Sequence, residues 1–129
     1  MARARLHHAL IFIFVILFGV AAHAADVVRT TSGVVRGKTS DDGKVRIFEG
    51  IPYAAPPVGR LRWRPPQAVH PWKDVRDATK FGARCMQGNI YADMNFRDDG
   101  PSEDCLYLNV WTAAKDASAN LPVMVWIYG

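Results

Sequence analysis

The feature that most constrains the fold is a pair of strand-forming segments near the end of the printed sequence. Residues 106–111 follow Glu103, Asp104 and Cys105 and carry mostly apolar side chains at both alternating sets of positions. This pattern predicts a largely buried strand. Residues 123–127 are a continuous apolar run, which is typical of a strand covered on both faces. The link between them is short for a helical crossover, so the two strands should run in opposite directions.

The region after residue 25 begins as short β structure. Three segments rich in β-branched residues predict strands, namely residues 27–30, 33–38 and 44–48. Residues 41–43, Asp-Asp-Gly, are a hairpin turn signal between the last two. In the third segment, Val45 and Ile47 should share one face while Lys44 and Arg46 share the other. The alternation predicts a sheet with one solvated face.

A proline-rich stretch, residues 50–71, follows these strands. Its six prolines exclude a helix interior or a central strand. A disordered linker is one interpretation, but the stretch also contains large apolar side chains, which favour an ordered, extended segment packed on the protein body. These side chains are Ile51, Tyr53, Leu61, Trp63 and Trp72, the last of which lies just beyond the stretch. Residues 74–83 are expected to form a short turn or helix.

The first 24 residues have the three-part pattern of a secretory signal peptide. Two arginines give a positive start, residues 9–20 form an apolar run, and Ala22-His23-Ala24 places small residues two apart. We therefore expect cleavage between Ala24 and Ala25, and a secreted protein, extracellular or periplasmic. The alternative is an uncleaved membrane anchor, but the run is shorter than the roughly 20 residues that span a bilayer. No stable membrane anchor is expected after cleavage.

The charge pattern argues against a nucleic-acid partner. The net charge of +4 falls to +2 without the leader, which holds two arginines and no acid. Arg60, Arg62 and Arg64 form the densest basic cluster, but Trp63 and prolines interrupt it, and a nucleic-acid surface needs a broader basic face. Three of the four histidines lie in the leader, and the sequence has no CxxC motif. We therefore predict no metal site and no cofactor.

The two cysteines, Cys85 and Cys105, flank a segment rich in turn residues and acids. In an exported chain, two cysteines indicate first a single disulfide. Two free thiols, with Cys105 buried at the start of its strand, are the alternative. The segment between them is expected to be a compact loop with apolar side chains of its own, Tyr91, Met94 and Phe96.

Three stretches, in order, resemble one enzyme family. Residues 48–57, FEGIPYAAPP, with residues 61–66, LRWRPP, are similar to the N-terminal region of the type-B carboxylesterases. Residues 102–111, SEDCLYLNVW, resemble that family's second signature, and residues 122–129, PVMVWIYG, resemble the strand that enters its oxyanion loop. The resemblance covers essentially the whole chain after the leader.

The resemblance implies an α/β fold, the N-terminal part of an α/β-hydrolase, with a small antiparallel sheet, the proline-rich segment and the first strands of the central sheet. Residues 25–129 would then be an incomplete carboxylesterase domain. The family hydrolyses carboxylic esters through a Ser, Glu or Asp, and His triad, with the serine in a Gly-x-Ser-x-Gly elbow. The sequence has no such elbow, and its one histidine after the leader is His70. No catalytic residue is therefore expected before Gly129.

The resemblance also assigns roles to particular residues. Gly129 corresponds to the first glycine of the oxyanion turn, where backbone N–H groups approach the developing charge. Tyr128 stands where many relatives have histidine. Arg62 and Glu103 match a structural ion pair, and Cys85 and Cys105 match the family's first disulfide, which closes a loop at the rim of the active-site gorge. Trp63 and Trp72 are expected to anchor the core.

The substrate implied by the resemblance is a small-molecule ester. In cholinesterases the disulfide loop carries a tryptophan that holds the choline cation. Here no tryptophan lies between Met86 and Asp104, which favours a general carboxylesterase. Two other functions stay open: a non-catalytic, cholinesterase-like binding or adhesion protein, and a self-sufficient small β-rich binding domain. An apolar terminal strand argues against the last of these.

Overall fold

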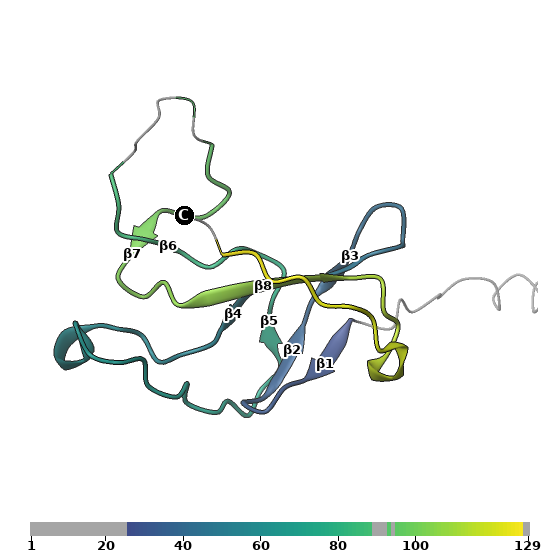
Figure 1. The fold of residues 1–129 in the computed structure, drawn as a ribbon, viewed down its shortest axis with the longest axis horizontal. Helices are drawn as coiled ribbons and strands as arrows, with labels where there is room; N and C mark the ends of the chain where they lie inside the picture. The colour runs from purple at the N-terminus through teal and green to yellow at the C-terminus, as the bar shows by residue number, and fades with distance from the viewer. Residues whose placement is uncertain (1–25, 89–92, 94, 128–129) are drawn as a thin grey trace, which may run out of the picture.

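The computed structural model describes residues 26–88, 93 and 95–127, which form three small sheets (Figure 1). The first sheet has the order β1-β2-β5, the second β3-β4-β8, and the third pairs β6 with β7. The strands are β1 (Val27–Arg29), β2 (Val34–Arg36), β3 (Lys38–Thr39), β4 (Arg46–Pro52), β5 (Arg76–Asp77), β6 (Arg84–Cys85), β7 (Pro101–Ser102) and β8 (Tyr107–Thr112). A 3-10 turn, η1 (Gly59–Leu61), lies between β4 and β5, and a second, η2 (Ala117–Ala119), follows β8.

The predicted hairpin around residues 41–43 is confirmed, since β3 pairs antiparallel with β4, Lys38 opposite Ile47. β1 and β2 pair antiparallel, Val28 opposite Val35. The segment predicted as residues 33–38 is divided into β2 and β3 at Gly37. A Cβ at this position would lie 2.3 Å from the carbonyl oxygen of Ile47. The chain can therefore pass from one sheet to the next here because glycine permits the close approach.

β4 is longer than predicted and extends to Pro52, which pairs with Tyr107 of β8. The expectation that proline excludes this segment from a central strand was wrong. Pro52 is the last residue of β4, and β3 pairs only with Arg46 and Ile47, so this end of β4 has no β3 ladder to disturb. The register between β4 and β8 shifts between Phe48 and Ile51.

The buried core lies between the first two sheets. Val35, Phe48 and Ala78 are buried, and Val28, Ile51 and Trp72 pack against them. The buried side chain that β4 contributes to the core is Phe48, whereas Val45 and Ile47, the apolar face in the predicted alternation, are only partly buried. Arg46 lies on the same side of the strand as Phe48, and its guanidinium stands over the phenyl ring at 5.2 Å. The face expected to be solvated therefore carries the core.

Residues 74–83 contain a strand where a turn or helix was predicted. β5 pairs parallel with β2, and an isolated bridge joins Thr79 to Glu49. Ala78 explains this extended conformation, because its N–H donates to the carbonyl of Arg36 at 2.7 Å and its carbonyl accepts from the N–H of Glu49 at 2.8 Å. Long-range backbone pairing with both sheets determines this segment, and local propensity does not reveal it.

The two tryptophans expected in the core differ. Trp72 is partly buried against the core, and its indole N–H donates to the carbonyl of Val34 at 2.8 Å. Trp63 is fully exposed, at 101 % of its reference area, so the prediction was wrong for this residue. It lies just after η1, in a turn whose described neighbours leave the indole uncovered.

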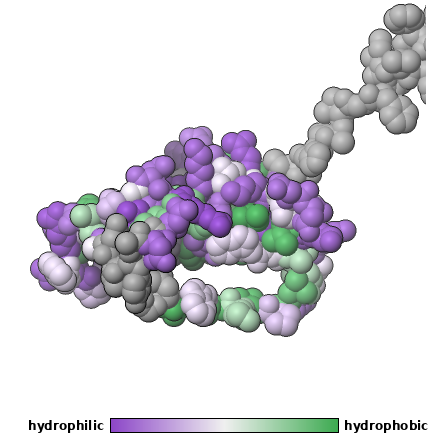
Figure 2. All heavy atoms as spheres, turned by 90° about the horizontal axis from the view of Figure 1, so that it is seen from above, coloured by the Kyte–Doolittle hydropathy of each residue, from purple (hydrophilic) through white to green (hydrophobic). Residues whose placement is uncertain are grey.

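Residues 123–127 form no strand, contrary to prediction, and their side chains are 77–92 % exposed. In Figure 1 the segment crosses β8, but the view in Figure 2 shows it as a largely apolar arch with open space behind it. β8 forms as predicted, yet Leu108, Val110 and Trp111 are 39–54 % exposed rather than buried. Among the described residues no strand pairs with the outer edge of β8, and no helical layer covers it. Both segments therefore lack the partners that bury such strands.

Gly50 provides a test of the β4–β8 junction. Its φ of +70° is left-handed, and an added Cβ would lie 2.7 Å from the carbonyl oxygen of Lys80. We expect Gly50→Ala to lower the free energy of unfolding by about 1–3 kcal/mol, because alanine is strained in this conformation and its Cβ would also crowd the Lys80 carbonyl. Gly43→Ala is the control, since its φ of +71° is similar but nothing lies within 4 Å of its Cβ. Denaturant melts of both variants measure the difference, and equal losses would show that the contact with Lys80 is unimportant.

Candidate functional site

The predicted cysteine loop is closed by a disulfide in the structure. Cys85 and Cys105 are joined across 20 residues, with their Cα atoms 4.9 Å apart, and the described residues contain no free cysteine. Next to the bond, β6 and β7 pair in parallel, Cys85 opposite Ser102. The two ends of the loop are therefore held by a covalent bond and by backbone pairing. Figure 1 shows β6 and β7 side by side at the base of the loop.

A second set of contacts that holds the loop centres on Arg84, for which the sequence analysis predicted no role. Its guanidinium forms an ion pair with Asp98 and stands 4.0 Å from the centre of the Phe96 ring. The Asp98 carboxylate also accepts from the N–H of Gly100 at 2.8 Å. These side chains are largely shielded, at 20 % exposed for Arg84 and 10 % for Asp98. Of the apolar loop residues predicted, Phe96 packs here, whereas Tyr91 and Met94 lie outside the described residues.

Arg62 and Glu103, 41 residues apart, are brought together by two contacts. Arg62 Nε donates to Glu103 Oε1 at 2.7 Å, and Nη2 contacts Oε2. The hydrogen bond raises the pKa of Arg62 and lowers the pKa of Glu103. Both side chains are about half exposed, so we assign the pair a positioning role rather than a large share of the stability. It ties the proline-rich segment to the end of the disulfide loop.

The residues that follow Glu103 connect the loop to the sheet. The N–H of Asp104 donates to Ser102 Oγ at 3.1 Å, and the Tyr107 ring packs against Gly82, where a Cβ would lie 2.4 Å from Tyr107 Cγ. Burial, followed by hydrogen bonding to Asp104, raises the pKa of Tyr107. On β8, Asn109 Oδ1 accepts from the N–H of Gly50 at 2.9 Å, at the point where the ladder with β4 is irregular. The contacts of Asp104, Tyr107 and Asn109 therefore position the end of the loop on the sheet.

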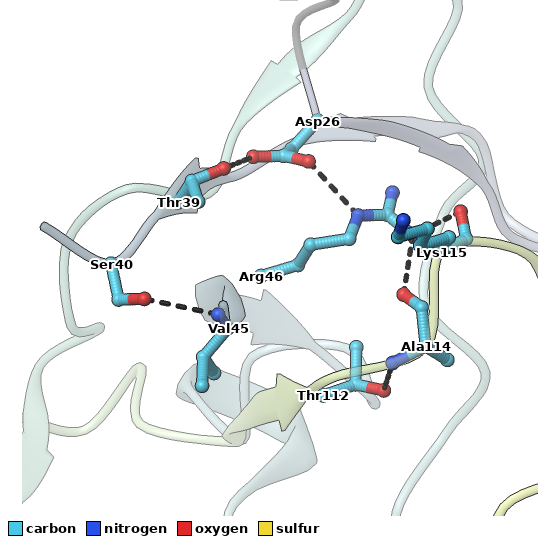
Figure 3. A network of polar contacts seen from close by, with 8 residues as sticks. All are labelled: Asp26, Thr39, Ser40, Val45, Arg46, Thr112, Ala114 and Lys115. Carbon is cyan, nitrogen blue, oxygen red and sulfur yellow. Dashed lines mark hydrogen bonds and ion pairs between the residues drawn. The ribbon is translucent and has the colours of Figure 1, made fainter. Parts of the chain in front are cut away.

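A third cluster surrounds Arg46 and joins distant parts of the chain (Figure 3). Arg46 Nε donates to Asp26 Oδ1 at 2.9 Å, and Nη1 donates to the carbonyls of Ala114 and Lys115 at 3.4 and 3.2 Å. Thr39 Oγ1 also donates to Asp26. An open depression of about 630 Å³ borders these residues. Sequence reasoning missed the cluster because its partners are 13 to 69 residues apart and share no local pattern.

Glu49 is a charged residue whose side chain is buried. It is 6 % exposed, and Lys38 Nζ contacts its Oε2 at 2.7 Å. The same ammonium donates to the carbonyl of Thr79 at 2.7 Å. Glu49 is therefore compensated by a close cation that joins β3, β4 and the segment after β5. The ion pair with Lys38 therefore accounts for the burial of Glu49, and no catalytic role is needed to explain it.

The other predicted positions contribute no active site in the part of the chain that the structure describes. Ala24, Ala25, Tyr128 and Gly129 lie outside the described residues. His70 is exposed, and within the described ranges no hydrogen bond joins it to a serine. No group of three or more potential metal-ligating side chains occurs among residues 26–88, 93 and 95–127. None of the helices in those ranges is long and apolar enough to span a membrane.

The fold and these ties can be compared with known proteins. Residues 24–129 match the family model described as "Carboxylesterase family". The chain is 47 % identical over 113 residues to the fumonisin B1 esterase of Sphingopyxis macrogoltabida, covering 85 % of this chain and 20 % of that protein. It is 45 % identical over 114 residues to an acetylcholinesterase of Bungarus fasciatus, covering 79 % of this chain and 18 % of that protein.

A solved structure gives the same result. The structure titled as a thermophilic PNB esterase superposes with a TM-score of 0.71 at 43 % identity, covering 80 % of this chain and 21 % of the other. The described sheets are therefore part of an α/β-hydrolase fold. The chain belongs to the carboxylesterase family, type B. It spans about a fifth of the length of the relatives it matches.

Proposed function

We propose that this chain is the N-terminal part of a secreted serine carboxylesterase, which hydrolyses small-molecule esters through an acyl-enzyme. The observation that carries the proposal is the family match over residues 24–129. The fumonisin B1 esterase and the PNB esterase, both among its relatives, are esterases by name. The serine, acid and histidine would lie in the remaining four-fifths of the enzyme.

Within that enzyme, the chain would have a positioning role. The disulfide, the Arg84–Asp98 pair and the Arg62–Glu103 pair fix the loop between Cys85 and Cys105. This loop would form the rim of the active-site gorge, and Gly129 would begin the oxyanion turn. A rim held at several points preserves the geometry that acyl transfer requires. No step of the reaction is assigned to a side chain before Gly129.

We propose a general carboxylesterase rather than a cholinesterase. Sequence identity does not distinguish the two, since an acetylcholinesterase is among the relatives at 45 %. The argument is the composition of the disulfide loop, which has no tryptophan to bind a quaternary ammonium group by its ring face. Phe96, its one described aromatic residue, is in contact with the guanidinium of Arg84.

Labelling of the longer protein with a fluorophosphonate tests the proposed function. We expect the label on one serine flanked by glycines two residues away on each side, identified by peptide mass spectrometry. A longer protein with another residue in place of that serine, and with no labelling, would instead be the non-catalytic binding or adhesion protein. Labelling at Ser32, Ser40, Ser102 or Ser118 would contradict the proposal.

Secretion makes a separate prediction. We expect the exported protein to begin at Ala25, because Ala22-His23-Ala24 follows the apolar run of the leader. N-terminal sequencing of material recovered outside the cytoplasm measures this directly. As a control, Ala24→Pro should block processing at this bond. A secreted chain that still carries Arg3 would show that the leader is retained.

A further inference from the structure

The turn that contains Trp63 has two unusual features, an exposed indole and a left-handed backbone conformation. Trp63 is fully exposed, whereas Trp72, nine residues later, packs on the core. Trp63 also has a φ of +58°, a left-handed conformation that is rare and strained for a bulky residue. Such strain persists only where the surrounding structure determines it, and it is often associated with binding surfaces.

The surroundings of Trp63 hold its backbone firmly. The N–H of Arg62 donates to the carbonyl of Gly59 at 3.3 Å, and the N–H of Arg64 donates to the carbonyl of Leu61 at 3.2 Å. The side chain of Arg62 is held by both oxygens of Glu103. At the base of this stretch, the N–H of Ala55 donates to the carbonyl of Gln67 at 2.9 Å. The backbone of this turn is thus held at several points, while the indole itself is uncovered.

A large apolar side chain on such a backbone is suited to fill a pocket. An indole buries about 150–250 Å² when it is covered, and a backbone that is fixed beforehand reduces the entropy lost on binding. The neighbouring exposed residues, Arg60 and Arg64, are both basic. The complementary surface is therefore an apolar pocket with an acceptor for the indole N–H and acidic groups at its edge.

We propose that Trp63 is a docking residue for a later segment of the same polypeptide, which covers it with such a pocket. This inference rests on the proposed function, in that it requires the longer protein. We place the segment that covers Trp63 on the same polypeptide because the printed chain spans only 20–21 % of its relatives' lengths. The Arg62–Glu103 pair then has a further role, since it orients the residue next to the docking side chain.

Hydroxyl-radical footprinting of the printed chain and of the longer protein tests the inference. Trypsin should release residues 63–73 as one peptide, because Pro65 follows Arg64, so both Trp63 and Trp72 are read on the same peptide. We expect Trp63 to be oxidised readily in the printed chain and only to the level of Trp72 in the longer protein. Trp72 is the internal control, since its contacts lie within this chain.

Two variants provide an independent measurement. In the longer protein, Trp63→Ala should lower Tm by several degrees, because it leaves an unfilled pocket, whereas Lys44→Ala in the exposed hairpin should not. In the printed chain neither variant should change Tm. Free oxidation of Trp63 in the longer protein, or protection only upon dimerisation or on addition of anionic vesicles, would overturn the inference. Protection of Trp63 in a longer protein without esterase activity would reject the proposed function and leave this inference standing.

Discussion

Purified protein of the printed sequence should not hydrolyse p-nitrophenyl butyrate, whereas the longer polypeptide should do so at a rate that an organophosphate abolishes. Four serines follow the leader, and none lies in a Gly-x-Ser-x-Gly elbow. In the structure their described contacts are local, for example Ser40 Oγ with Asp42 and Ser118 Oγ with Asp116. No described serine is hydrogen-bonded to His70, so none has the adjacent base that activates a nucleophile.

The size of the expected difference follows from known serine hydrolases. Loss of the nucleophile costs about 10⁶ in rate, and loss of one oxyanion donor costs about 10²–10³. In the longer protein, alanine in place of the elbow serine should reproduce the inactivity of the printed chain. Ser40→Ala, in the exposed hairpin, should retain full activity. Organophosphate-sensitive turnover by the printed chain would show that the catalytic residues lie before residue 130.

The sequence predicted best those features that depend on local patterns or on the family motifs. The β3–β4 hairpin was recognisable from its Asp-Asp-Gly turn, and β8 from its apolar, strand-forming residues. The structure also joins Cys85 to Cys105 and Arg62 to Glu103. Both pairs are distant in sequence. The presence of only two cysteines in an exported chain already indicated the disulfide, whereas the resemblance to a family paired Arg62 with Glu103.

The errors have a common physical cause, which is that long-range partners decide burial and pairing. Phe48 enters the core although it shares a side of β4 with Arg46, because Val35 and Ala78 meet it there. β5 forms because Ala78 is bonded to both sheets. Residues 123–127 have strong strand propensity, but within the described residues no neighbouring strand satisfies their backbone. Propensity alone does not supply that neighbour.

The cluster around Arg46 was outside the reach of sequence reasoning for a related reason. Arg46 contacts Asp26 at the start of the first sheet and carbonyls of Ala114 and Lys115 beyond β8. Carbonyl acceptors leave no signature in a sequence, because every residue has one. Such contacts become visible only when the arrangement of the strands is known.

Removal of the disulfide is expected to have the largest effect on stability among substitutions in this chain. A bridge that closes a loop of this length stabilises a fold by about 3 kcal/mol in the chain-entropy model, because it restricts the unfolded chain. Cys85→Ala with Cys105→Ala should therefore lower the free energy of unfolding of the longer secreted protein by about that amount. The β6–β7 pairing and the Arg84–Asp98 pair act in the folded state, so they do not replace this contribution.

The exposed Arg62–Glu103 ion pair provides a control for the disulfide. Glu103→Gln removes the charge that faces Arg62, about two residues from the disulfide, but both side chains are half exposed and solvent weakens the pair. Its loss of stability should be much smaller than that of the double cysteine variant, as measured by guanidinium melts. Non-reducing peptide mapping of the secreted protein should recover Cys85 and Cys105 in one cross-linked species. Alkylation of both thiols without prior reduction, or equal melts for the two variants, would contradict a stabilising bridge. A bridge that passes both tests restricts the loop before folding, so that Arg84, Phe96 and Asp98 need only close a loop whose ends already meet.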